Sequence, residues 1–533
     1  MLRISNFNVP FDDETPLTEL TAKRLKLPPQ AVLEVVIVRK AVDARRYKNA
    51  PIYFVYVLEV VVSGNEDKVL ARLHKDRQIE KVIAEKIETK PITAKKQEQR
   101  PIVVGFGPAG MFAALTLARQ GQNPLVLERG WDVDRRHRAI EEFWQTGELE
   151  TKTNVQFGEG GAGTFSDGKL TTRISDTKMQ RILEDFITAG APAEIKYLHK
   201  PHIGTDLLRM VVKNIRKEIV RLGGEIRFEA QVTDVDVIDG KVTAIVVNDD
   251  QRIDCQAVFL GIGHSARDTY EMLAAHKISM EAKAFAIGVR IEHPQEYIDI
   301  SQYGQDAKNP RLPTADYALT FQDRERGRGA YSFCMCPGGQ VVAAASEIGG
   351  VVTNGMSNYR RSSGIANSAL LVTVGPEDFG QGVLDGIAFQ RKYEQLAFSC
   401  AGKNYSAPVQ SVGDFLDGKQ GSTDFLTVPT YKPGVTPVDL RECLPAFVTD
   451  TLALALPHFG RKIKGFDDPR AAMTGVETRS SAPCRIRRDR VTFVSENTVG
   501  LYPMGEGAGY AGGIMSAAVD GVNAAEAFMK SSI

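Results

Sequence analysis

Alternating hydrophobic and polar residues over the first 95 positions predict a small, separate domain. β-Branched clusters favour strands, and apolar residues at helical spacing favour helices. The predicted strands cover residues 2–7, 31–40, 52–62 and 79–87, and the predicted helices cover residues 15–25 and 66–74. This order of elements is that of the split βαβ, or ferredoxin-like, motif. We therefore expect an N-terminal ferredoxin-like α+β domain over residues 1–95, with a polar linker at 93–100.

After this linker the pattern changes to a strand, a glycine turn and a helix of small residues. A strand at 101–104 leads into Gly105-Phe106-Gly107-Pro108-Ala109-Gly110, and a second strand at 123–127 ends in Glu128. This is the fingerprint of a dinucleotide-binding βαβ unit in its full context. The glycines let the turn close, let the backbone approach a pyrophosphate, and let helix and strand pack closely. The helix N-terminus offers N–H groups to the anion, and Glu128 is placed to accept hydrogen bonds from ribose hydroxyls.

A second glycine-rich stretch follows about fifty residues later. It contains Gly158-Glu159-Gly160-Gly161-Ala162-Gly163-Thr164 and then Ser166-Asp167-Gly168-Lys169-Leu170. Two loops with exposed backbone amides suit a ligand longer than one pyrophosphate site requires, such as an extended flavin. The alternative is a glycine-rich active-site loop without cofactor contact.

Two more segments farther along the chain also combine a strand with a glycine loop. An amphipathic helix at 206–222 and β-runs at 225–237 and 241–247 precede an apolar strand that ends in Gly261-Ile262-Gly263. Near the C-terminus, a strand closes on a glycine loop at 505–513, and a helix of small residues follows at 515–528. A helix that begins near Gly512–Ile514 would present its positive end, which stabilises negative charge on a reduced flavin ring.

Composition narrows the class of partner. Of the 533 residues, 43% are hydrophobic and 25% are charged, which is typical of a soluble globular protein. The 66 basic and 66 acidic residues cancel, so the chain lacks the field of a dedicated nucleic-acid or anionic-membrane binder. A small molecule is the expected partner, and nucleic acid is not. The 1–95 segment alone is mildly basic.

The cysteines and the N-terminus indicate the compartment. Six cysteines in a chain of this length are too few for a disulfide scaffold, and none has the C-x-x-C spacing of zinc or thioredoxin sites. We therefore predict no metal site and a reducing, cytoplasmic location. Asp12, Asp13 and Glu14 precede any long apolar run, so we expect no signal peptide. The uncharged run at 101–118 is explained by the glycine turn, and we expect no membrane span.

Taken together, the glycine motifs resemble those of the two-dinucleotide-domain flavoproteins. The most similar family is that of the uncharacterised bacterial FAD-dependent dehydrogenases, or NAD(P)/FAD-dependent oxidoreductases. The resemblance covers nearly the whole chain, through VVGFGPAGMFAALTLA, GGAGTFSDGKL, YSFCMCPGG, GVETRSSAP and GLYPMGEGAGYAGGI. YSFCMCPGG and GVETRSSAP are more specific than the glycine motifs.

The resemblance implies a set of FAD contacts. The adenosine and pyrophosphate would lie against Gly105, Gly107, Pro108, Ala109, Gly110, Glu128 and Arg129. The adenine would meet the backbone of Val232, Gly505 and Glu506 would hold the pyrophosphate and ribityl, and Gly513 and Ile514 would hold the ring. Further expected cofactor contacts come from the other glycine segments: Gly160, Gly161, Ala162, Gly163, Thr164, Lys169, Leu170, Gly261, Gly263 and Gly512.

The predicted fold class is α/β. A Rossmann-like FAD-binding domain, formed by residues 100–265 and 496–533, carries an inserted mixed α+β cap domain at 266–495, in addition to the N-terminal ferredoxin-like α+β domain. The cap would roof the flavin, so its polar residues are the substrate candidates.

Four cap residues are candidates for catalysis. Cys334 and Cys336 would share a strand face, as a redox pair or as a pocket wall formed with the Pro-Gly-Gly turn that follows. Glu477 and Arg479 would bind a carboxylate or carbonyl substrate, or form an ordinary ion pair.

We therefore predict a FAD-dependent oxidoreductase that transfers hydride between flavin N5 and an organic substrate. The chain has no second G-x-G-x-x-G motif with a ribose acid, so we expect no separate NAD(P) domain. If NAD(P)H is a co-substrate, it would bind transiently in the flavin crevice. The alternatives are a flavin-containing protein that modifies or binds RNA through the basic 1–95 domain, and a flavin-binding relative without catalysis.

Overall fold

The structure is a computed structural model, and it describes residues 1–45, 51–82, 99–172, 174 and 176–531. The chain divides into two compact units. The first comprises Met1–Pro91, Pro192–Pro201 and Asp299–Pro313, and the second comprises Ile92–Ala191, His202–Ile298 and Thr314–Ile533. Two later segments of the chain therefore complete the N-terminal unit, which the sequence analysis did not predict.

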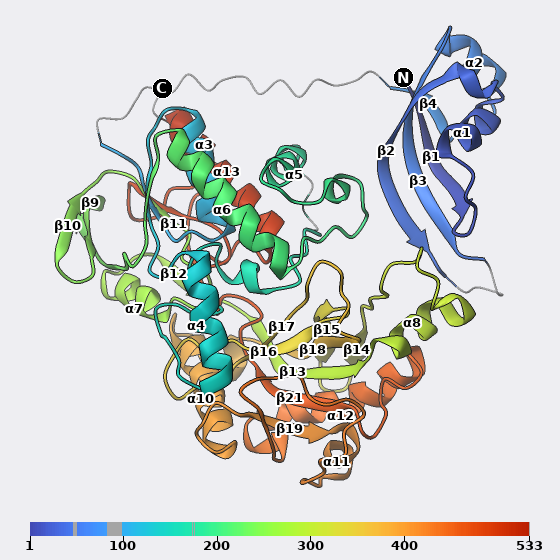
Figure 1. The fold of residues 1–533 in the computed structure, drawn as a ribbon. Coiled ribbons are helices and arrows are strands. Elements are labelled where there is room, and N and C mark those ends of the chain that lie inside the picture. Colours follow the sequence, from blue (N-terminus) through green and yellow to red (C-terminus); the bar gives the residue numbers. More distant parts are fainter. Residues whose placement is uncertain (46–50, 83–98, 173, 175, 532–533) are drawn as a thin grey trace. The chain divides into compact units, whose positions relative to one another are not determined.

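A four-stranded antiparallel sheet with two helices forms the N-terminal unit (Figure 1). Its elements are β1 (Leu2–Pro10), α1 (Leu17–Leu25), β2 (Val32–Asp43), β3 (Tyr53–Val62), α2 (Glu66–Arg72) and β4 (Ile79–Lys81). The strand order is β2-β3-β1-β4, and the elements follow one another along the chain as the sequence predicted. β3 alternates between buried and half-buried residues, so one face of the sheet packs on the helices. The predicted continuation of the last strand to residue 87 lies outside the described residues.

A five-stranded parallel sheet is the centre of the second unit. In sheet order its strands are β23 (Leu501–Pro503), β11 (Val258–Leu260), β5 (Ile102–Val104), β6 (Leu125–Leu127) and β7 (Glu225–Arg227). Three helices pack side by side over it: α3 (Pro108–Arg119), α6 (Thr205–Arg221) and α13 (Ile514–Ser531) (Figure 1). Strands from both ends of the chain share this sheet, so the N-terminal and C-terminal glycine loops leave it at the same edge.

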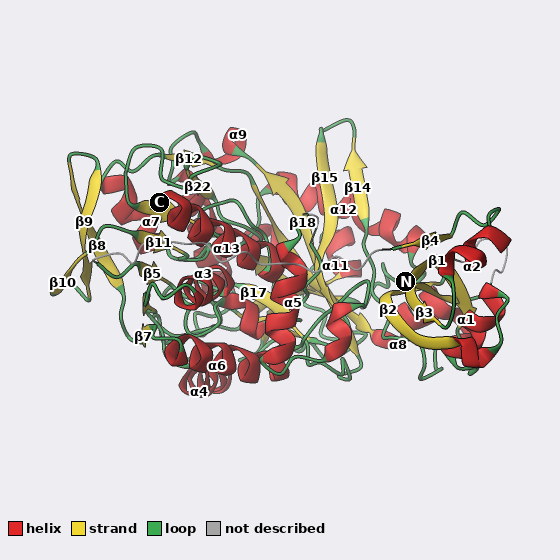
Figure 2. Ribbon diagram, turned by 90° about the horizontal axis from the view of Figure 1, so that it is seen from above, coloured by secondary structure: helices red, strands yellow, loops and turns green. Residues whose placement is uncertain are grey.

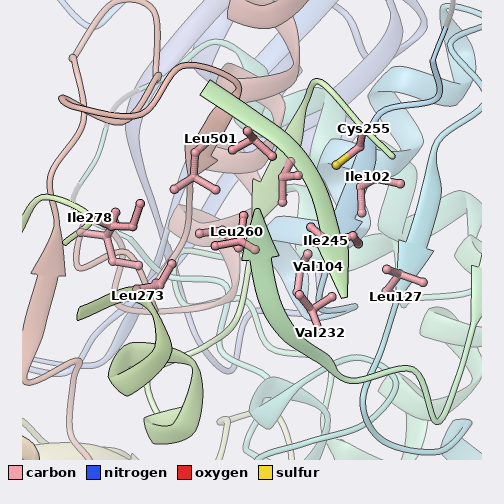
Figure 3. Packing of buried hydrophobic residues seen from close by; sticks show 14 of the residues in the cluster. Ile102, Val104, Leu127, Val232, Ile245, Cys255, Leu260, Leu273, Ile278 and Leu501 are labelled. Carbon is pink, nitrogen blue, oxygen red and sulfur yellow. The ribbon is translucent and has the colours of Figure 1, made fainter. Parts of the chain in front are cut away.

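An antiparallel ribbon packs against this sheet and forms a hydrophobic core with it. The ribbon consists of β8 (Val232–Ile238), β9 (Lys241–Val247) and β10 (Gln251–Asp254). Figure 3 shows Val232 and Ile245 from the ribbon among Ile102, Val104 and Leu260 from the parallel strands. The helix α7 (Arg267–Ala275) adds the fully buried Leu273. The predicted β-run at 225–237 is two separate strands, β7 and β8, because β7 joins the parallel sheet.

A seven-stranded mixed sheet occupies most of the chain from 285 to 477. In sheet order its strands are β14 (Thr320–Asp323), β15 (Arg328–Cys336), β18 (Ile365–Val374), β13 (Phe285–Pro294), β21 (Ala472–Glu477), β19 (Ala407–Ser411) and β20 (Val435–Pro437). β14 and β15 form a hairpin that Figure 2 shows from above. The parallel sheet and this sheet belong to one compact unit, and the predicted domain boundaries at 265 and 495 stay predictions.

Helices and short strands complete the second unit. They are α4 (Val133–Thr146), α5 (Lys178–Thr188), α9 (Pro376–Phe379), α10 (Asp385–Cys400), α11 (Val412–Asp417), α12 (Ala446–Lys462), and the pairs β12 (Met280–Ala282) with β22 (Cys484–Ile486) and β16 (Gln340–Ala343) with β17 (Thr353–Met356). The helix α8 (Gln295–Tyr303) begins in the second unit and ends in the first, because the division falls between Ile298 and Asp299. Within the described residues, no helix has the length and apolar character needed to cross a membrane.

Candidate functional site

A cavity of about 570 Å³ opens at the carboxyl ends of the parallel strands. Its lining begins with the residues that directly follow β5, β6 and β11, at Gly105, Glu128 and Gly261. Ligands of open α/β sheets bind at this edge, and the volume lies within the range of small-molecule sites. We refer to it below as the main cavity.

The first glycine loop closes tightly against the neighbouring strand. Gly105 has φ +89°, and an added Cβ would overlap the carbonyl oxygen of Gly261. An added Cβ at Gly110 would overlap the carbonyl oxygen of Gly105, so Gly110 brings α3 close to β5 and does not line the cavity. Gly107, the residue before α3, does line it, together with Pro108 and Ala109. The N–H groups at this helix end are available to an anion.

Glu128 holds three loops together at the cavity wall. Its carboxylate accepts hydrogen bonds from the backbone N–H of Phe106 (2.7 Å), Gly130 (3.0 Å) and Gly158 (3.0 Å). Glu128 is buried and lines the cavity. The predicted ribose acceptor thus also fixes the positions of the first two glycine loops.

Arg136 is a part of the site that the sequence analysis missed. Its fully buried guanidinium, on α4, donates hydrogen bonds to the carbonyl oxygens of Asn154 (2.9 Å), Val155 (2.9 Å), Gly158 (3.3 Å), Glu159 (2.7 Å) and Gly161 (3.0 Å). Burial lowers the pKa of Arg136 to about 9. One side chain therefore shapes the loop that carries Gly161 to the cavity. Nothing in the local sequence pattern distinguishes this arginine from those on the exposed face of α4.

Three glycines leave room for a ligand. Added Cβ atoms at Gly263, Gly512 and Gly513 would meet nothing within 4 Å, and all three residues line the main cavity. A side chain at these positions would project into open space. This open space fits a site for an elongated ligand, in which the backbone approaches the ligand closely.

Most of the predicted cofactor residues line the main cavity: Gly105, Gly107, Pro108, Ala109, Glu128, Arg129, Gly161, Ala162, Gly163, Lys169, Val232, Gly261, Gly263, Glu506, Gly512, Gly513 and Ile514. Five do not: Gly110, Gly160, Thr164, Leu170 and Gly505. Thr164 and Leu170 are buried behind the lining. An added Cβ at Gly160 would overlap the Thr164 hydroxyl, and one at Gly505 would lie 2.7 Å from the Ala109 Cβ. These five residues pack the loops and do not contact the cavity.

The register of β15 shifts at the two cysteines. Cys334 has φ +43° within this shift, and it lines the main cavity. Cys336 is fully buried and does not line the cavity. The predicted regular strand is thus interrupted, because a bulge re-aims one side chain.

Two cations bind the backbone at Cys334 and Met335. Lys169 Nζ donates a hydrogen bond to the carbonyl oxygen of Met335, and Arg290 Nη1 donates one to the carbonyl oxygen of Cys334 (3.0 Å). The hydrogen bond from Cys336, followed by the charges of Lys169 and Arg290, holds the pKa of Cys334 well below its usual value despite burial. The same pairing raises the pKa of Cys336. Cys336 Sγ also donates a hydrogen bond to the backbone carbonyl oxygen of Cys334 (3.3 Å), so Cys334 is the more acidic thiol of the pair.

Glu477 and Arg479 both line the main cavity, but each forms an ion pair with a distant residue. Glu477 accepts hydrogen bonds from Arg290 Nε (2.8 Å) and Nη2 (2.9 Å). Arg479 donates to Glu394 from Nε (3.1 Å) and Nη2 (2.9 Å). Of the two predicted roles, the ion pair is the one seen for both side chains.

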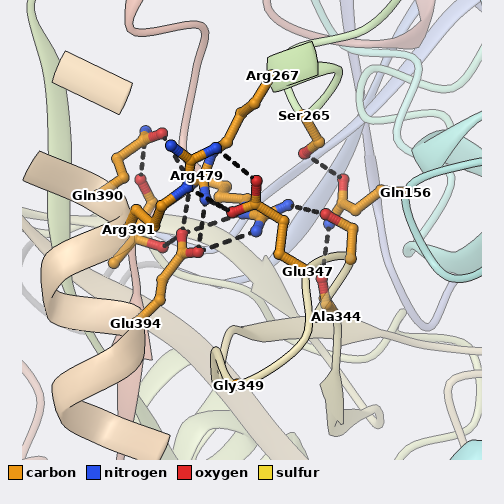
Figure 4. A network of polar contacts seen from close by, with 12 residues as sticks. Gln156, Ser265, Arg267, Ala344, Glu347, Gly349, Gln390, Arg391, Glu394 and Arg479 are labelled. Carbon is orange, nitrogen blue, oxygen red and sulfur yellow. Dashed lines mark hydrogen bonds and ion pairs between the residues drawn. The ribbon is translucent and has the colours of Figure 1, made fainter. Parts of the chain in front are cut away.

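Arg479 belongs to a buried network of charges that Figure 4 shows. Glu394 also accepts a hydrogen bond from Arg267 Nη2 (2.7 Å), and Glu347 pairs with Arg267 and with Arg391 Nη2 (2.7 Å). Although burial opposes it, the charges of Arg267 and Arg479 hold the pKa of Glu394 far below its usual value. Each buried charge has a partner, as buried charges require. Among the described residues, no group of three or more His, Cys, Asp or Glu side chains could hold a metal ion.

Comparisons with known proteins agree with the glycine motifs. Residues 284–480, which contain Arg290, Cys334 and Glu477, match the family described as FAD-dependent protein, C-terminal domain-like. An uncharacterised protein of Clostridium beijerinckii is 51% identical over 528 residues, with 98% of each chain covered. The chain belongs to this family of FAD-dependent proteins. The predicted family is thereby confirmed. Residues 1–61 match a Domain of unknown function (DUF8436).

Two solved enzyme structures illustrate the distant similarities. Glycine oxidase from Bacillus cereus is 10% identical, with 82% of this chain and 96% of that chain covered and a TM-score of 0.32. L-Proline dehydrogenase from P. horikoshii is also 10% identical, with 82% and 95% covered and a TM-score of 0.36. Similarity this low carries no information about the reaction of this chain.

Proposed function

We propose that this protein is an FAD-dependent oxidoreductase and that FAD lies extended along the main cavity. One observation carries the proposal: glycine loops that lie about four hundred residues apart in the chain line one cavity at the carboxyl edge of a parallel sheet. At Gly263, Gly512 and Gly513 an added Cβ would meet nothing within 4 Å, so the cavity is open at these three glycines. A cavity lined by glycine loops at a helix N-terminus suits a long ligand with a pyrophosphate at its centre.

In this proposal the parallel sheet is a Rossmann-like FAD-binding fold, formed by residues 100–265 and 496–533. Residues 266–495 form the cap that covers the flavin, and residues 1–95 form a ferredoxin-like domain. Gly107, Pro108 and the N-terminus of α3 would hold the pyrophosphate, while Glu128 and Arg129 would hold the adenosine end. The N-terminus of α13 would lie at the ring.

Bound FAD would supply the acceptor or donor of a hydride, and the chain would supply position and charge. Ile514 and Gly513 would support the ring. Lys169, from the second glycine loop, and Cys334, from the cap, border the same cavity, so they are the groups placed to hold or move a proton. Glu477 and Arg479 are already paired, and we assign them to orienting this wall of the cavity.

Glu506 is a third titratable group in the main cavity. Burial raises its pKa to about 7, although Lys283 partly opposes the shift. A buried carboxyl that titrates near neutral pH is a common feature of active sites. We propose that Glu506 contacts the ribityl and pyrophosphate region as a hydrogen-bond donor when protonated and as an acceptor when ionised.

The substrate in this proposal is a small organic molecule, and NAD(P)H is a transient partner that enters the same cavity. The protein would act in the reducing environment of the cytoplasm, in keeping with its six free cysteines. An anaerobic titration of the purified protein with NADH, NADPH and a panel of metabolites tests this function. Bleaching of the flavin absorbance by one of them is the expected result. If the flavin is bound but no reductant bleaches it and none of the panel reoxidises it after chemical reduction, the oxidoreductase proposal is wrong.

A further inference from the structure

A second cavity, of about 470 Å³, lies behind the glycine loop of the main cavity. Gly163 and Ser166 line the main cavity, whereas Phe165, between them, lines the second one. The two cavities therefore share one wall. The volume of the second cavity falls within the range of small-molecule sites, and none of the predicted cofactor or catalytic residues lines this cavity.

Several polar side chains around this second cavity lack a partner. Arg209 on α6, Asn358 and Ser362 in the loops after β17, and Lys432 line it, and none of their side chains makes a hydrogen bond or ion pair with the described part of the chain. All four side chains can donate hydrogen bonds. Arg209 is half-buried, so its guanidinium is not a fully solvated surface charge, whereas Asn358, Ser362 and Lys432 are exposed to solvent.

His137 on α4 adds one unsatisfied ring nitrogen, although its Nε2 lies near Glu141. Its Nδ1 is buried and has no hydrogen-bond partner among the described residues. Burial, followed by the charge of Arg209, lowers the pKa of His137. An unpaired buried polar atom costs about 1–3 kcal/mol, so such atoms mark places where a partner is missing.

Acidic side chains are scarce on the same surface. Of the cavity-lining residues that the structure describes, Glu141 is the sole acid, and its Oε1 lies 3.5 Å from His137 Nε2. It therefore faces the histidine, and it forms no ion pair with Arg209 or Lys432. The cavity thus has an excess of positive charge, from Arg209 and Lys432 against Glu141.

Apolar residues form the rest of the lining. Trp144, Val342 and Met356 face the cavity together with Phe165. The Trp144 ring is anchored, because its Nε1 donates a hydrogen bond to the carbonyl oxygen of Ala343 (3.1 Å). An inorganic ion would use only the polar side of this site, whereas an organic molecule would use both sides.

We propose that the second cavity binds a small organic anion, with its oxyanion group on Arg209 and Lys432 and its body against Trp144 and Phe165. Charge-assisted hydrogen bonds of this type are the strong ones, and arginine is well suited to carboxylates and phosphates. The site is separate from the FAD site, and it does not depend on the proposed oxidoreductase activity.

The shared wall connects the ligand to the main cavity. Ser357 lines the second cavity, and its hydroxyl donates a hydrogen bond to Asp167, which lines the main one. Asp167 also accepts a hydrogen bond from Arg361 Nη2 (2.6 Å). A ligand that shifts the loop around Ser357 would therefore act on a residue of the main cavity.

Trp144 provides a direct test, since the chain contains only two tryptophans. In the full-length Trp131→Phe protein, the remaining emission comes from Trp144, and it is titrated with inorganic phosphate, citrate and benzoate at constant ionic strength. We expect a saturable change with at least one of these anions. Binding of phosphate would show that the cationic side of the cavity holds an oxyanion. Stronger binding of citrate or benzoate would show that the apolar side holds the organic body.

A matched pair of variants on α6 controls for folding and for general charge effects. Arg209→Gln removes the cavity arginine, whereas Arg221→Gln removes an exposed arginine that pairs with Glu218 on the same helix. We expect Arg209→Gln to weaken binding about tenfold or more, and Arg221→Gln to leave it unchanged. If no anion gives a saturable change, or if both variants bind as the parent does at an unchanged melting temperature, the proposal is wrong.

Discussion

Replacing Arg136 by methionine is the sharpest test of how the FAD site is built. Methionine keeps an unbranched apolar stem of similar reach but removes all five hydrogen bonds to the loop at 154–161. It also removes a guanidinium that lies 4.8 Å from the centre of the Phe165 ring. The glycine loop would then lose its principal internal support.

The structure sets the size of the effect. The carbonyl of Gly158 also accepts a hydrogen bond from the Gly161 N–H, that of Gly161 accepts one from the Thr164 N–H, and that of Glu159 accepts one from the Thr164 hydroxyl (3.5 Å), so these three keep a partner. Asn154 and Val155 have no other donor among the described residues, and an unpaired buried carbonyl costs about 1–3 kcal/mol. The two unpaired carbonyls together cost about 2–6 kcal/mol. Removal of the buried charge of Arg136 regains part of this free energy. We expect a net loss of about 2–4 kcal/mol, which equals a weakening of FAD binding by about 30-fold or more if the loop orders on binding.

Fluorescence titration of the apoprotein with FAD measures this loss. Arg138→Met is the control, because Arg138 lies on the same helix and is exposed. We expect the control to keep the Kd and the melting temperature of the parent. Equal Kd values and equal melting temperatures for the Arg136 and Arg138 variants would refute the reasoning.

Three further predictions concern the same cavity. Gly513→Val fills open space next to the proposed ring site, so it should abolish FAD retention while leaving the melting temperature of the apoprotein unchanged; a loss of apoprotein stability would contradict the open-space argument. In the apoprotein we expect fast alkylation by iodoacetamide near pH 7, at Cys334. Cys334→Ser should eliminate this fast reaction, whereas Cys336→Ser should retain it at a reduced rate. Equal rates in the parent and both variants would show that Cys334 is not a thiolate. Burial raises the pKa of Glu506 from 4.5 to about 7, so between these pH values the folded state binds a proton that the unfolded state does not, and stability falls as the pH rises through this range. Glu506→Gln should flatten this part of the plot of melting temperature against pH. An unchanged slope would contradict the assignment.

The sequence predicted the parts of the site that backbone geometry dictates. Gly105 and Gly110 are needed because an added Cβ would overlap a carbonyl oxygen, and such requirements leave a readable spacing in the chain. The order of elements in the N-terminal unit followed from hydrophobic alternation for the same reason. The positions of the glycine loops around one cavity could be expected, since parallel strands end at a common edge.

Pairings between distant side chains could not be predicted. Glu477 pairs with Arg290 across 187 positions, and Arg479 pairs with Glu394 across 85, and no spacing rule connects such residues. The same is true of the segments near residues 195 and 305 that complete the N-terminal unit. The bulge at Cys334 was missed because a register shift depends on the neighbouring strand, β18, and not on the local sequence.

The flavin content of the purified full-length protein tests the central claim most directly. The claim predicts a yellow protein that releases FAD, identified by its mass, in a ratio of one per chain on denaturation, and a Gly513→Val protein that is colourless. A parent protein that is colourless and does not take up added FAD would contradict the account.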